Sequence, residues 1–380
     1  MNRLSGFRGH RTVGRPVARL TSGVASACVV VLGMAGIGAG AAVADTVIDT
    51  VPVVNPVGVA ITPDGSRVYV TNQSEDSVSV INTGTNMVVD SVAVEDFPTG
   101  VAITPDGSRV YVTNRDDDSV SVIETAGNTV IETVEVGNSP VGVAVTPDGS
   151  RVYVTNRGDD SVSVIDTATT TVFDTVAVGS SPRGVAVTPD GSRAYVTNRE
   201  DDSVSVIDTA ITTVVDTVAV GSSPRGVAVS PDGSRAYVTN RGDDSVSVIE
   251  IATTTVVETV AVGDGPREVA VTPDGFRAYV TNTDGDSVSV IDTITTTVVE
   301  TVPVGDFPFG VAVTPDGSRA YVANILDDTV SVIGVDRCLG SLCIATGSLV
   351  GGGSTGSGGA GSLVGAGSLA GVGSAGSTAS

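Results

Sequence analysis

The chain has 380 residues, with 20 basic and 43 acidic side chains and a formal net charge of −23. Every basic side chain except His10 is Arg, and because phosphate backbones are bound by clustered cations, this balance argues against a nucleic-acid partner. Hydrophobic residues make up 41% of the chain but aromatic residues only 3%. The core must therefore consist of Val, Ala, Ile and Thr, which favour β-sheets.

Residues 1–44 are typical of a secretory signal peptide. Arginines without any acidic neighbour are followed by an apolar stretch that ends in Ala42-Val43-Ala44, the small-x-small pattern that a signal peptidase requires. An uncleaved membrane anchor is the alternative, since the stretch is just long enough to span a bilayer. We expect cleavage after Ala44, and hence a secreted or cell-envelope protein without a stable membrane span.

The tripeptide Pro-Asp-Gly recurs along the chain in steps of 42 residues, without an insertion or deletion. The prolines of these copies are Pro63, Pro105, Pro147, Pro189, Pro231, Pro273 and Pro315. A fixed period of this size is the signature of a repeat architecture, in which each unit buries its face against the next.

Each repeat contains four short segments rich in β-branched residues, such as "GVAVTP", "RAYVTN", "SVSVID" and "TVVDTVAVG". The Pro-Asp-Gly-Ser between the first two predicts a tight hairpin, because Pro fixes φ and Gly accepts a left-handed conformation. Four antiparallel strands in about 40 residues form a propeller blade. We therefore predict an all-β, seven-bladed β-propeller of four-stranded blades over residues 45–335.

The two ends of the repeat region predict how the ring closes. The segment Asp45–Val53 matches the fourth strand of a blade, whereas the last repeat supplies only three strands and ends near Val335. We expect the N-terminal strand to complete the last blade, with Thr46–Val51 paired to Thr329–Ile333. Such pairing would remove the open sheet edges that otherwise invite aggregation.

A Tyr-Val-Thr-Asn motif follows each Pro-Asp-Gly, with Tyr-Val-Ala-Asn in the last repeat. Its tyrosines are Tyr69, Tyr111, Tyr153, Tyr195, Tyr237, Tyr279 and Tyr321. Together with "TPDGSR" and "DSVSVI", this motif resembles the YVTN family of β-propeller repeats of secreted bacterial and archaeal surface-layer proteins. The resemblance covers residues 45–335 and implies a seven-bladed propeller in an extracellular or cell-surface setting. The motif itself carries no catalytic residue.

The residue after each blade-linking proline is expected at the mouth of the central channel. These residues are Val57, Thr99, Val141, Arg183, Arg225, Arg267 and Phe309. Three consecutive blades thus bring guanidinium groups to the mouth, and such planar donors suit a carboxylate, a phosphate or an acidic sugar. Four further arginines follow the YVTN motif on the same face, namely Arg115, Arg157, Arg199 and Arg241. The alternative is pairing with acidic neighbours in the turns, which we favour for these four.

Other charged residues are interpreted as structural. The arginine of each Pro-Asp-Gly-Ser-Arg segment is expected to pair with the turn aspartate. The acidic turns do not predict a calcium site, because equivalent positions on adjacent blades lie about 10 Å apart, whereas calcium needs oxygens at about 2.3–2.6 Å. We expect no metal and no cofactor.

Catalysis finds little support in the composition. After signal cleavage the chain has no His, Lys or Trp, which excludes a Ser-His-Asp triad and a His-ligated zinc. A carboxylate pair could still supply an acid and a base. Departures from the repeat are few, and they include Glu268 beside Arg267, Phe276 in place of Ser, and the segment 306–310.

The C-terminal end carries Cys338 and Cys343, which in an oxidising compartment predict a small disulfide loop within a clip at residues 336–346. From residue 347 to residue 380 the chain is mainly Gly, Ser and Ala. Such a composition predicts a flexible tail, because it cannot offset its own ordering entropy.

We infer a monomeric binding scaffold that presents its Arg-bearing face to an anionic small molecule, an envelope glycan or an envelope protein. The first alternative is a lactonase-like or lyase-like enzyme with carboxylates at the channel mouth, which would require Asp or Glu to converge with Arg in one pocket. The second alternative is a structural surface-layer component. Absence of the usual catalytic residues favours a protein that is not an enzyme.

Overall fold

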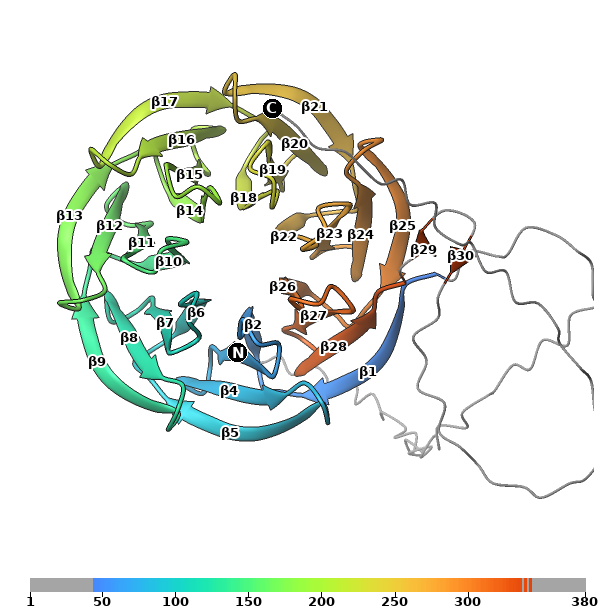
Figure 1. The fold of residues 1–380 in the computed structure, drawn as a ribbon, viewed down its shortest axis with the longest axis horizontal. Coiled ribbons are helices and arrows are strands. Elements are labelled where there is room, and N and C mark those ends of the chain that lie inside the picture. Colours follow the sequence, from blue (N-terminus) through green and yellow to red (C-terminus); the bar gives the residue numbers. More distant parts are fainter. Residues whose placement is uncertain (1–43, 337, 340–341, 344–380) are drawn as a thin grey trace, which may run out of the picture. The chain divides into compact units, whose positions relative to one another are not determined.

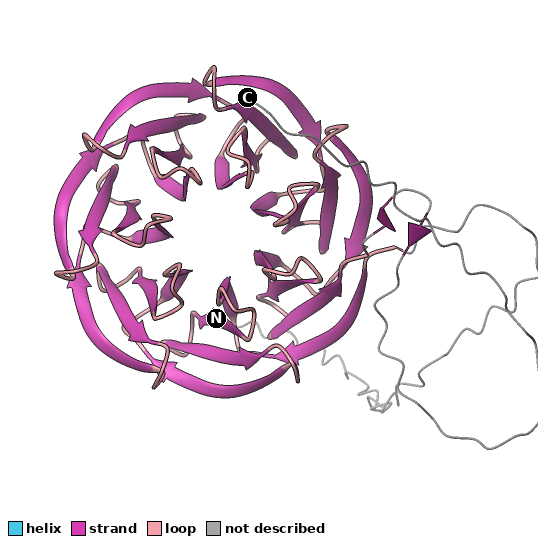
Figure 2. Ribbon diagram, viewed as in Figure 1, coloured by secondary structure: helices cyan, strands magenta, loops and turns pink. Residues whose placement is uncertain are grey.

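The computed structural model describes residues 44–336, 338–339 and 342–343. Over the described residues the chain forms seven four-stranded antiparallel sheets around a central channel, without a helix (Figures 1 and 2). The predicted seven-bladed β-propeller is confirmed. In the same residues no helix is long and apolar enough to cross a membrane. The signal segment before residue 44 and the tail from residue 347 lie outside the described residues.

Each blade begins with an inner strand beside the channel (Figure 1). The inner strands are β2 (Pro56–Ile61), β6 (Pro98–Ile103), β10 (Pro140–Val145), β14 (Pro182–Val187), β18 (Pro224–Val229), β22 (Pro266–Val271) and β26 (Pro308–Val313). The second strands carry the YVTN motif and are β3 (Arg67–Asn72), β7 (Arg109–Asn114), β11 (Arg151–Asn156), β15 (Arg193–Asn198), β19 (Arg235–Asn240), β23 (Arg277–Asn282) and β27 (Arg319–Asn324).

Two more strands complete each blade towards the periphery. The third strands are β4 (Ser77–Asn82), β8 (Ser119–Glu124), β12 (Ser161–Asp166), β16 (Ser203–Asp208), β20 (Ser245–Glu250), β24 (Ser287–Asp292) and β28 (Thr329–Gly334). The outer strands are β5 (Met87–Ala93), β9 (Thr129–Glu135), β13 (Thr171–Ala177), β17 (Thr213–Ala219), β21 (Thr255–Ala261), β25 (Thr297–Pro303) and β1 (Thr46–Pro52).

The N-terminal strand β1 completes the last blade. It pairs antiparallel with β28, so that Val47 lies opposite Ile333 and Val51 opposite Val330, with one irregularity in the register between Val47 and Asp49. The pairing predicted for Thr46–Val51 is therefore confirmed. The first and last strands of the propeller, β1 and β28, are neighbours in one sheet, so the two ends of the propeller close the ring of blades.

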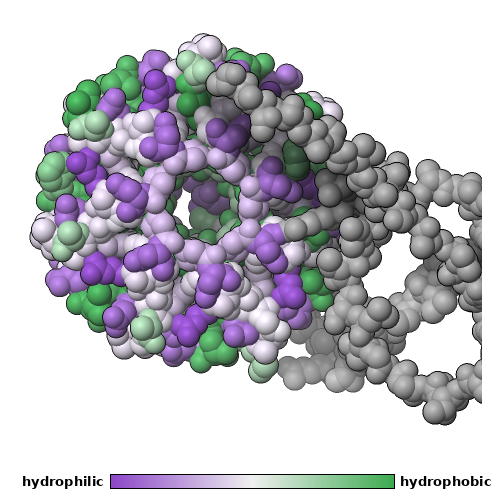
Figure 3. Space-filling view, in the orientation of Figure 1, coloured by the Kyte–Doolittle hydropathy of each residue, from purple (hydrophilic) through white to green (hydrophobic). Residues whose placement is uncertain are grey.

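The hydrophobic core lies between adjacent blades. The cluster that joins the last blade to the first contains Val51, Tyr321 and Val330 from one blade and Val68 and Ile81 from the next, all 0–1% exposed. Period-2 alternation places these side chains on the inter-blade faces, and burying them is the main favourable term for closing the ring. The outer strands expose valines and isoleucines, and Figure 3 shows apolar patches at the periphery and an opening at the centre.

In the Pro-Asp-Gly turns the arginine does not pair with the turn aspartate, contrary to the expectation from the sequence. In the first repeat, the Asp64 carboxylate accepts hydrogen bonds from the Ser66 amide and from the hydroxyls of Ser66 and Thr62. The Arg67 guanidinium reaches the next blade instead, and its Nη1 donates to the Thr125 carbonyl at 2.9 Å. The expectation was wrong because the aspartate is saturated by its own turn, whereas the neighbouring blade offers a free carbonyl. These arginines still have a structural role, since they connect adjacent blades.

Two short strands follow the propeller, β29 (Cys338–Leu339) and β30 (Leu342–Cys343). They pair antiparallel with Cys338 opposite Cys343. The disulfide between these cysteines stays a prediction. The remainder of the expected clip at residues 336–346 lies mostly outside the described residues.

Candidate functional site

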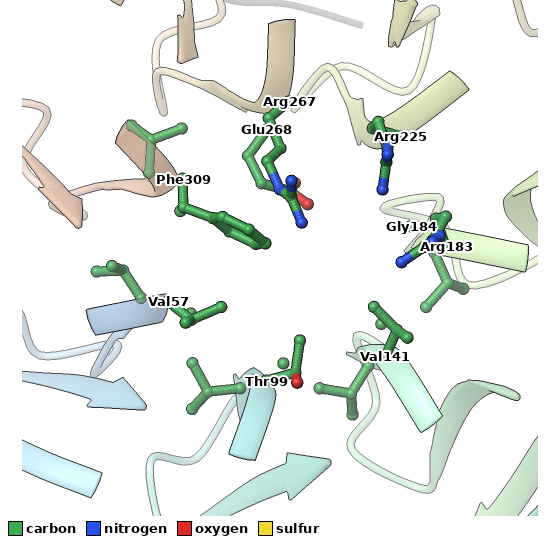
Figure 4. Close-up of a pocket in the computed structure, with 18 of the residues that line it drawn as sticks. Val57, Thr99, Val141, Arg183, Gly184, Arg225, Arg267, Glu268 and Phe309 are labelled. Atoms are coloured by element: carbon green, nitrogen blue, oxygen red, sulfur yellow. The ribbon is translucent and has the colours of Figure 1, made fainter. Parts of the chain in front are cut away.

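The channel mouth contains a pocket with a cavity volume of about 150 Å³. Every residue that follows a blade-linking proline lines it, from β2 round to β26, as predicted for the channel mouth (Figure 4). One side of the pocket is basic and is formed by Arg183, Arg225 and Arg267 from three consecutive blades. The other side is formed by Val57, Thr99, Val141 and Phe309. The pocket is therefore cationic on one side and largely apolar on the other.

The threonine of the YVTN motif holds these residues in place. The Thr155 hydroxyl donates to the Arg183 carbonyl at 2.7 Å and accepts from the Gly142 amide at 2.8 Å, so it joins two inner strands. Thr239 does the same for the Arg267 carbonyl and the Gly226 amide. Through these bonds the motif fixes the backbone from which the pocket side chains project.

A glycine follows the pocket residue in six of the seven inner strands, because the next inner strand approaches closely. A Cβ at Gly184 would lie 2.6 Å from the Arg225 carbonyl oxygen. Glu268 replaces this glycine in β22, and its amide donates to Thr281 Oγ1 at 3.0 Å. Its carboxylate lies towards Gly226, where an added Cβ would be 2.6 Å from Glu268 Oε2. The glycine of the preceding blade thus leaves the space that the Glu268 side chain fills.

The three pocket arginines have unpaired guanidinium groups. None of them has an ion pair or a side-chain hydrogen bond with another described residue, and the buried Nε atoms of Arg183 and Arg225 have no partner. Burial, together with the charges of neighbouring arginines, lowers the pKa of Arg183 to about 9 and that of Arg225 to about 10. Since guanidinium groups keep their proton at neutral pH, three mutually repelling cations face one cavity.

Arg267 and Glu268 give the pocket its asymmetry. The Arg267 guanidinium lies over the Phe309 ring, 3.2 Å from the ring centroid, which is a cation–π contact. Burial lowers the pKa of Arg267 well below its usual range, and the Arg225 charge acts in the same direction. Burial raises the pKa of Glu268 to about 7, although Arg267 and Arg225 oppose this shift. A hydrogen bond from the Val269 amide also lowers the pKa of Glu268, but burial outweighs it, and the carboxylate forms no ion pair with a described residue.

The four outer arginines do not line the pocket. Arg115 pairs with Asp116 at 2.9 Å and lies over the Phe97 ring, and Arg241 pairs with Asp284 of the next blade at 3.0 Å. Arg157 and Arg199 have no ion pair within the described part of the chain. All four add positive charge near the pocket, and this charge helps to lower the pKa of Arg183 or Arg225. Pairing with acidic turn residues is thus confirmed for Arg115, while Arg241 finds its partner one blade away.

Metal ligands do not converge in the described residues, where no group of three or more His, Cys, Asp or Glu side chains is placed to hold an ion. The acidic turns use their carboxylates on the links between blades, as Asp159 does when it accepts from the Asn138 amide at 2.6 Å.

Sequence reasoning located Arg183, Arg225, Arg267 and Phe309 at the mouth but did not include Glu268 in the site. The available signal was the loss of a glycine that the other six repeats keep. In the sequence this loss is only a departure from the repeat, because the three-dimensional packing is needed to show where the Glu268 carboxylate lies.

The fold and this pocket define a class of protein, a seven-bladed β-propeller with a basic, asymmetric channel mouth. Comparison with protein families matches residues 44–333 to the virginiamycin B lyase family, and the chain belongs to that family. The resemblance to the YVTN-repeat family is not confirmed by this match.

Among solved structures, the chain is similar to the hydrazine synthase of Kuenenia stuttgartiensis. The two share 27% sequence identity with a TM-score of 0.69, and the alignment covers 74% of this chain and 96% of the other. The comparison with curated proteins found no match.

Proposed function

We propose that the protein binds a small carboxylate with an attached apolar group at the channel mouth. The observation that carries this proposal is that Arg183, Arg225 and Arg267 share one pocket and that none of them forms an ion pair with a described residue. Guanidinium groups that face one another raise the free energy of the empty site, and a carboxylate that bridges them removes this cost. Charge-assisted hydrogen bonds to a carboxylate would also satisfy the buried Nε atoms.

The size and polarity of the pocket narrow the ligand class. A cavity of about 150 Å³ is comparable to the engineered apolar cavities that hold benzene. Val57, Val141 and the Phe309 ring offer apolar contact opposite the arginines (Figure 4). An aromatic or short aliphatic carboxylate of about the size of benzoate matches both sides. With export, as the N-terminal segment predicts, the site would meet free carboxylates or the acidic ends of envelope glycans and proteins.

Glu268 supports a second candidate, a lyase-type elimination. A base with a pKa of about 7 is well matched to take a proton from a carbon beside a carbonyl group. The C–H electron pair would form a C=C bond as the leaving group departs with its own bonding pair, and Arg225 would stabilise the charge that develops. Membership of a family with a lyase name adds weight to this candidate. The two candidates use Glu268 oppositely, since carboxylate binding favours its protonated form and proton abstraction its ionised form.

Benzoate titration across neutral pH tests the proposed function. Because an ionised Glu268 repels the ligand carboxylate and a protonated one can donate to it, affinity should rise about threefold to tenfold between pH 8 and pH 6. The shift follows the raised pKa of Glu268, because benzoate stays ionised over this range. Isothermal titration calorimetry at the two pH values measures it.

Glu268→Gln is the matched control, since it keeps the shape of the side chain and removes its titration. Its benzoate affinity should be nearly independent of pH and close to that of the wild-type protein at pH 6. Absence of benzoate binding at both pH values would rule out the proposed ligand class. A pH dependence that survives in Glu268→Gln would remove Glu268 from the explanation.

A further inference from the structure

The gap between the sixth and seventh blades is closed by Asp45, the residue just before β1. Its side chain is fully buried and accepts hydrogen bonds from Arg277 Nη1 at 3.0 Å and from the Tyr279 hydroxyl. The Asp336 amide, just beyond β28, also donates to Asp45 Oδ1 at 2.8 Å. One carboxylate therefore joins the start of the propeller, its end and the neighbouring blade.

Two other blades have an asparagine at this position, whereas the remaining four have a threonine. Asn128 stands just before β9, where its Oδ1 accepts from the Tyr69 hydroxyl and its Nδ2 donates to Asp90 of the preceding outer strand at 2.8 Å. Asn86 likewise accepts a hydrogen bond from the Tyr321 hydroxyl and donates one to the Asp49 carboxylate. An aspartate cannot donate from its side chain, so at Asp45 the donor role passes to the backbone. The Asp45 nitrogen lies 3.1 Å from Oε2 of Glu300, which is the counterpart of Asp90.

We propose that the Ala44–Asp45 peptide bond is a processing site, and that the α-ammonium group released at Asp45 forms an ion pair with Glu300 that locks the ring. A signal peptidase would add water across this bond, giving Ala44 a carboxylate and Asp45 an amine that takes up a proton. Ala44 is exposed, whereas Asp45 is 3% exposed, so this bond joins an accessible residue to a buried one. The small-x-small pattern at Ala42–Ala44 ends at the same place.

The residues around the Asp45 nitrogen favour the protonated α-amino group that cleavage would release there. The Glu300 carboxylate accepts from the Asp45 nitrogen at 3.1 Å, while the carboxylate of Asp45 itself is paired with Arg277, the only cation among the residues in contact. An α-amino group has an ordinary pKa of about 7.7–8.0, and nearby carboxylates raise it, so the group is mostly protonated at neutral pH. Hydrolysis thus replaces one neutral N–H donor with a charged group that has three donors, at the point where β1 enters the last blade.

The absence of lysine provides a selective test. The sequence contains no lysine, so the α-amino group is the only primary amine of the processed chain. The full chain would be exported from a bacterial host, and the mass of its N-terminal peptide would be determined. The purified protein would then be acetylated with an N-hydroxysuccinimide ester at pH 7, and the rate would be followed by mass spectrometry.

We expect the N-terminal peptide to begin at Asp45, and the α-amino group to react about threefold to tenfold faster in Glu300→Gln than in the wild-type protein, because a free amine loses its proton more readily. Glu258→Gln is the matched control, since Glu258 holds the same position one blade earlier, and it should react at the wild-type rate. A chain that retains residues 1–44 or begins elsewhere would overturn the proposal. Equal acetylation rates in all three proteins would overturn it as well.

Discussion

Replacing Arg183, Arg225 and Arg267 together with alanine is expected to weaken benzoate binding at least about 100-fold. Each guanidinium is expected to supply a charge-assisted hydrogen bond of about 1.5–3 kcal/mol, and the loss of two such bonds already reaches this factor. The triple variant should fold as the wild-type protein does, because no hydrogen bond or ion pair joins the three guanidinium groups to another described residue. Isothermal titration calorimetry measures the affinity, and circular dichroism verifies the fold.

The matched control changes three arginines of the same face that do not line the pocket. Arg115, Arg157 and Arg199, replaced together by alanine, cause the same change in net charge. These three half-buried side chains lie outside the pocket, and charges in contact with solvent are screened over about 8–10 Å at physiological salt. This variant should therefore lose only about twofold to fivefold in affinity. Equal losses in the two triple variants would show that the face attracts anions without a defined pocket.

Asp45→Ala is expected to lower the free energy of unfolding by about 2–3 kcal/mol. Removal of the carboxylate leaves the partly buried Arg277 guanidinium and the Tyr279 hydroxyl without their acceptor, and this cost is larger than the net value of the pair itself. The loss falls where the two ends of the propeller meet, so opening of the last blade becomes easier. Urea unfolding followed by circular dichroism measures the effect.

Asp49→Ala provides the comparison within the same strand. Asp49 is exposed, and its carboxylate accepts from Asn86 Nδ2 at 2.9 Å at the surface of the blade. Its loss should cost less than about 1 kcal/mol, as is usual for an exposed polar contact. Similar destabilisation by the two substitutions would contradict the assignment of Asp45 as the residue that locks the ring.

The fold could be predicted because its determinants are local and repeated. An unbroken 42-residue step fixes the number of blades, and alternation in segments such as "SVSVID" fixes which side chains enter the inter-blade core. Closure followed from a mismatch at the two ends, with one surplus strand at Thr46–Pro52 and three strands in the last repeat. The irregularity between Val47 and Asp49 was not predictable, since it arises where separate chain ends must meet without a turn to set their register.

The site was only partly predictable. Arg183, Arg225 and Arg267 could be placed at the mouth because the position after a linking proline is set by the repeat itself. The partner of Arg241 could not be predicted, because Asp284 is 43 residues away in the sequence and becomes a neighbour only when the blades pack together. The position of the Glu268 side chain could not be predicted either, because it occupies the space that Gly226 leaves in the preceding blade. Contacts between blades therefore carry the information that one repeat lacks.

The location of a bound carboxylate tests the central claim, that three unpaired guanidinium groups form an anion site, most directly. In crystals soaked with 4-bromobenzoate, an anomalous difference map at the bromine edge would locate the ligand. We predict a bromine peak beside Val57 and Val141, with the carboxylate density directed at Arg183, Arg225 and Arg267. An empty channel mouth at saturating ligand, or a bromine peak confined to other surfaces, would contradict the account.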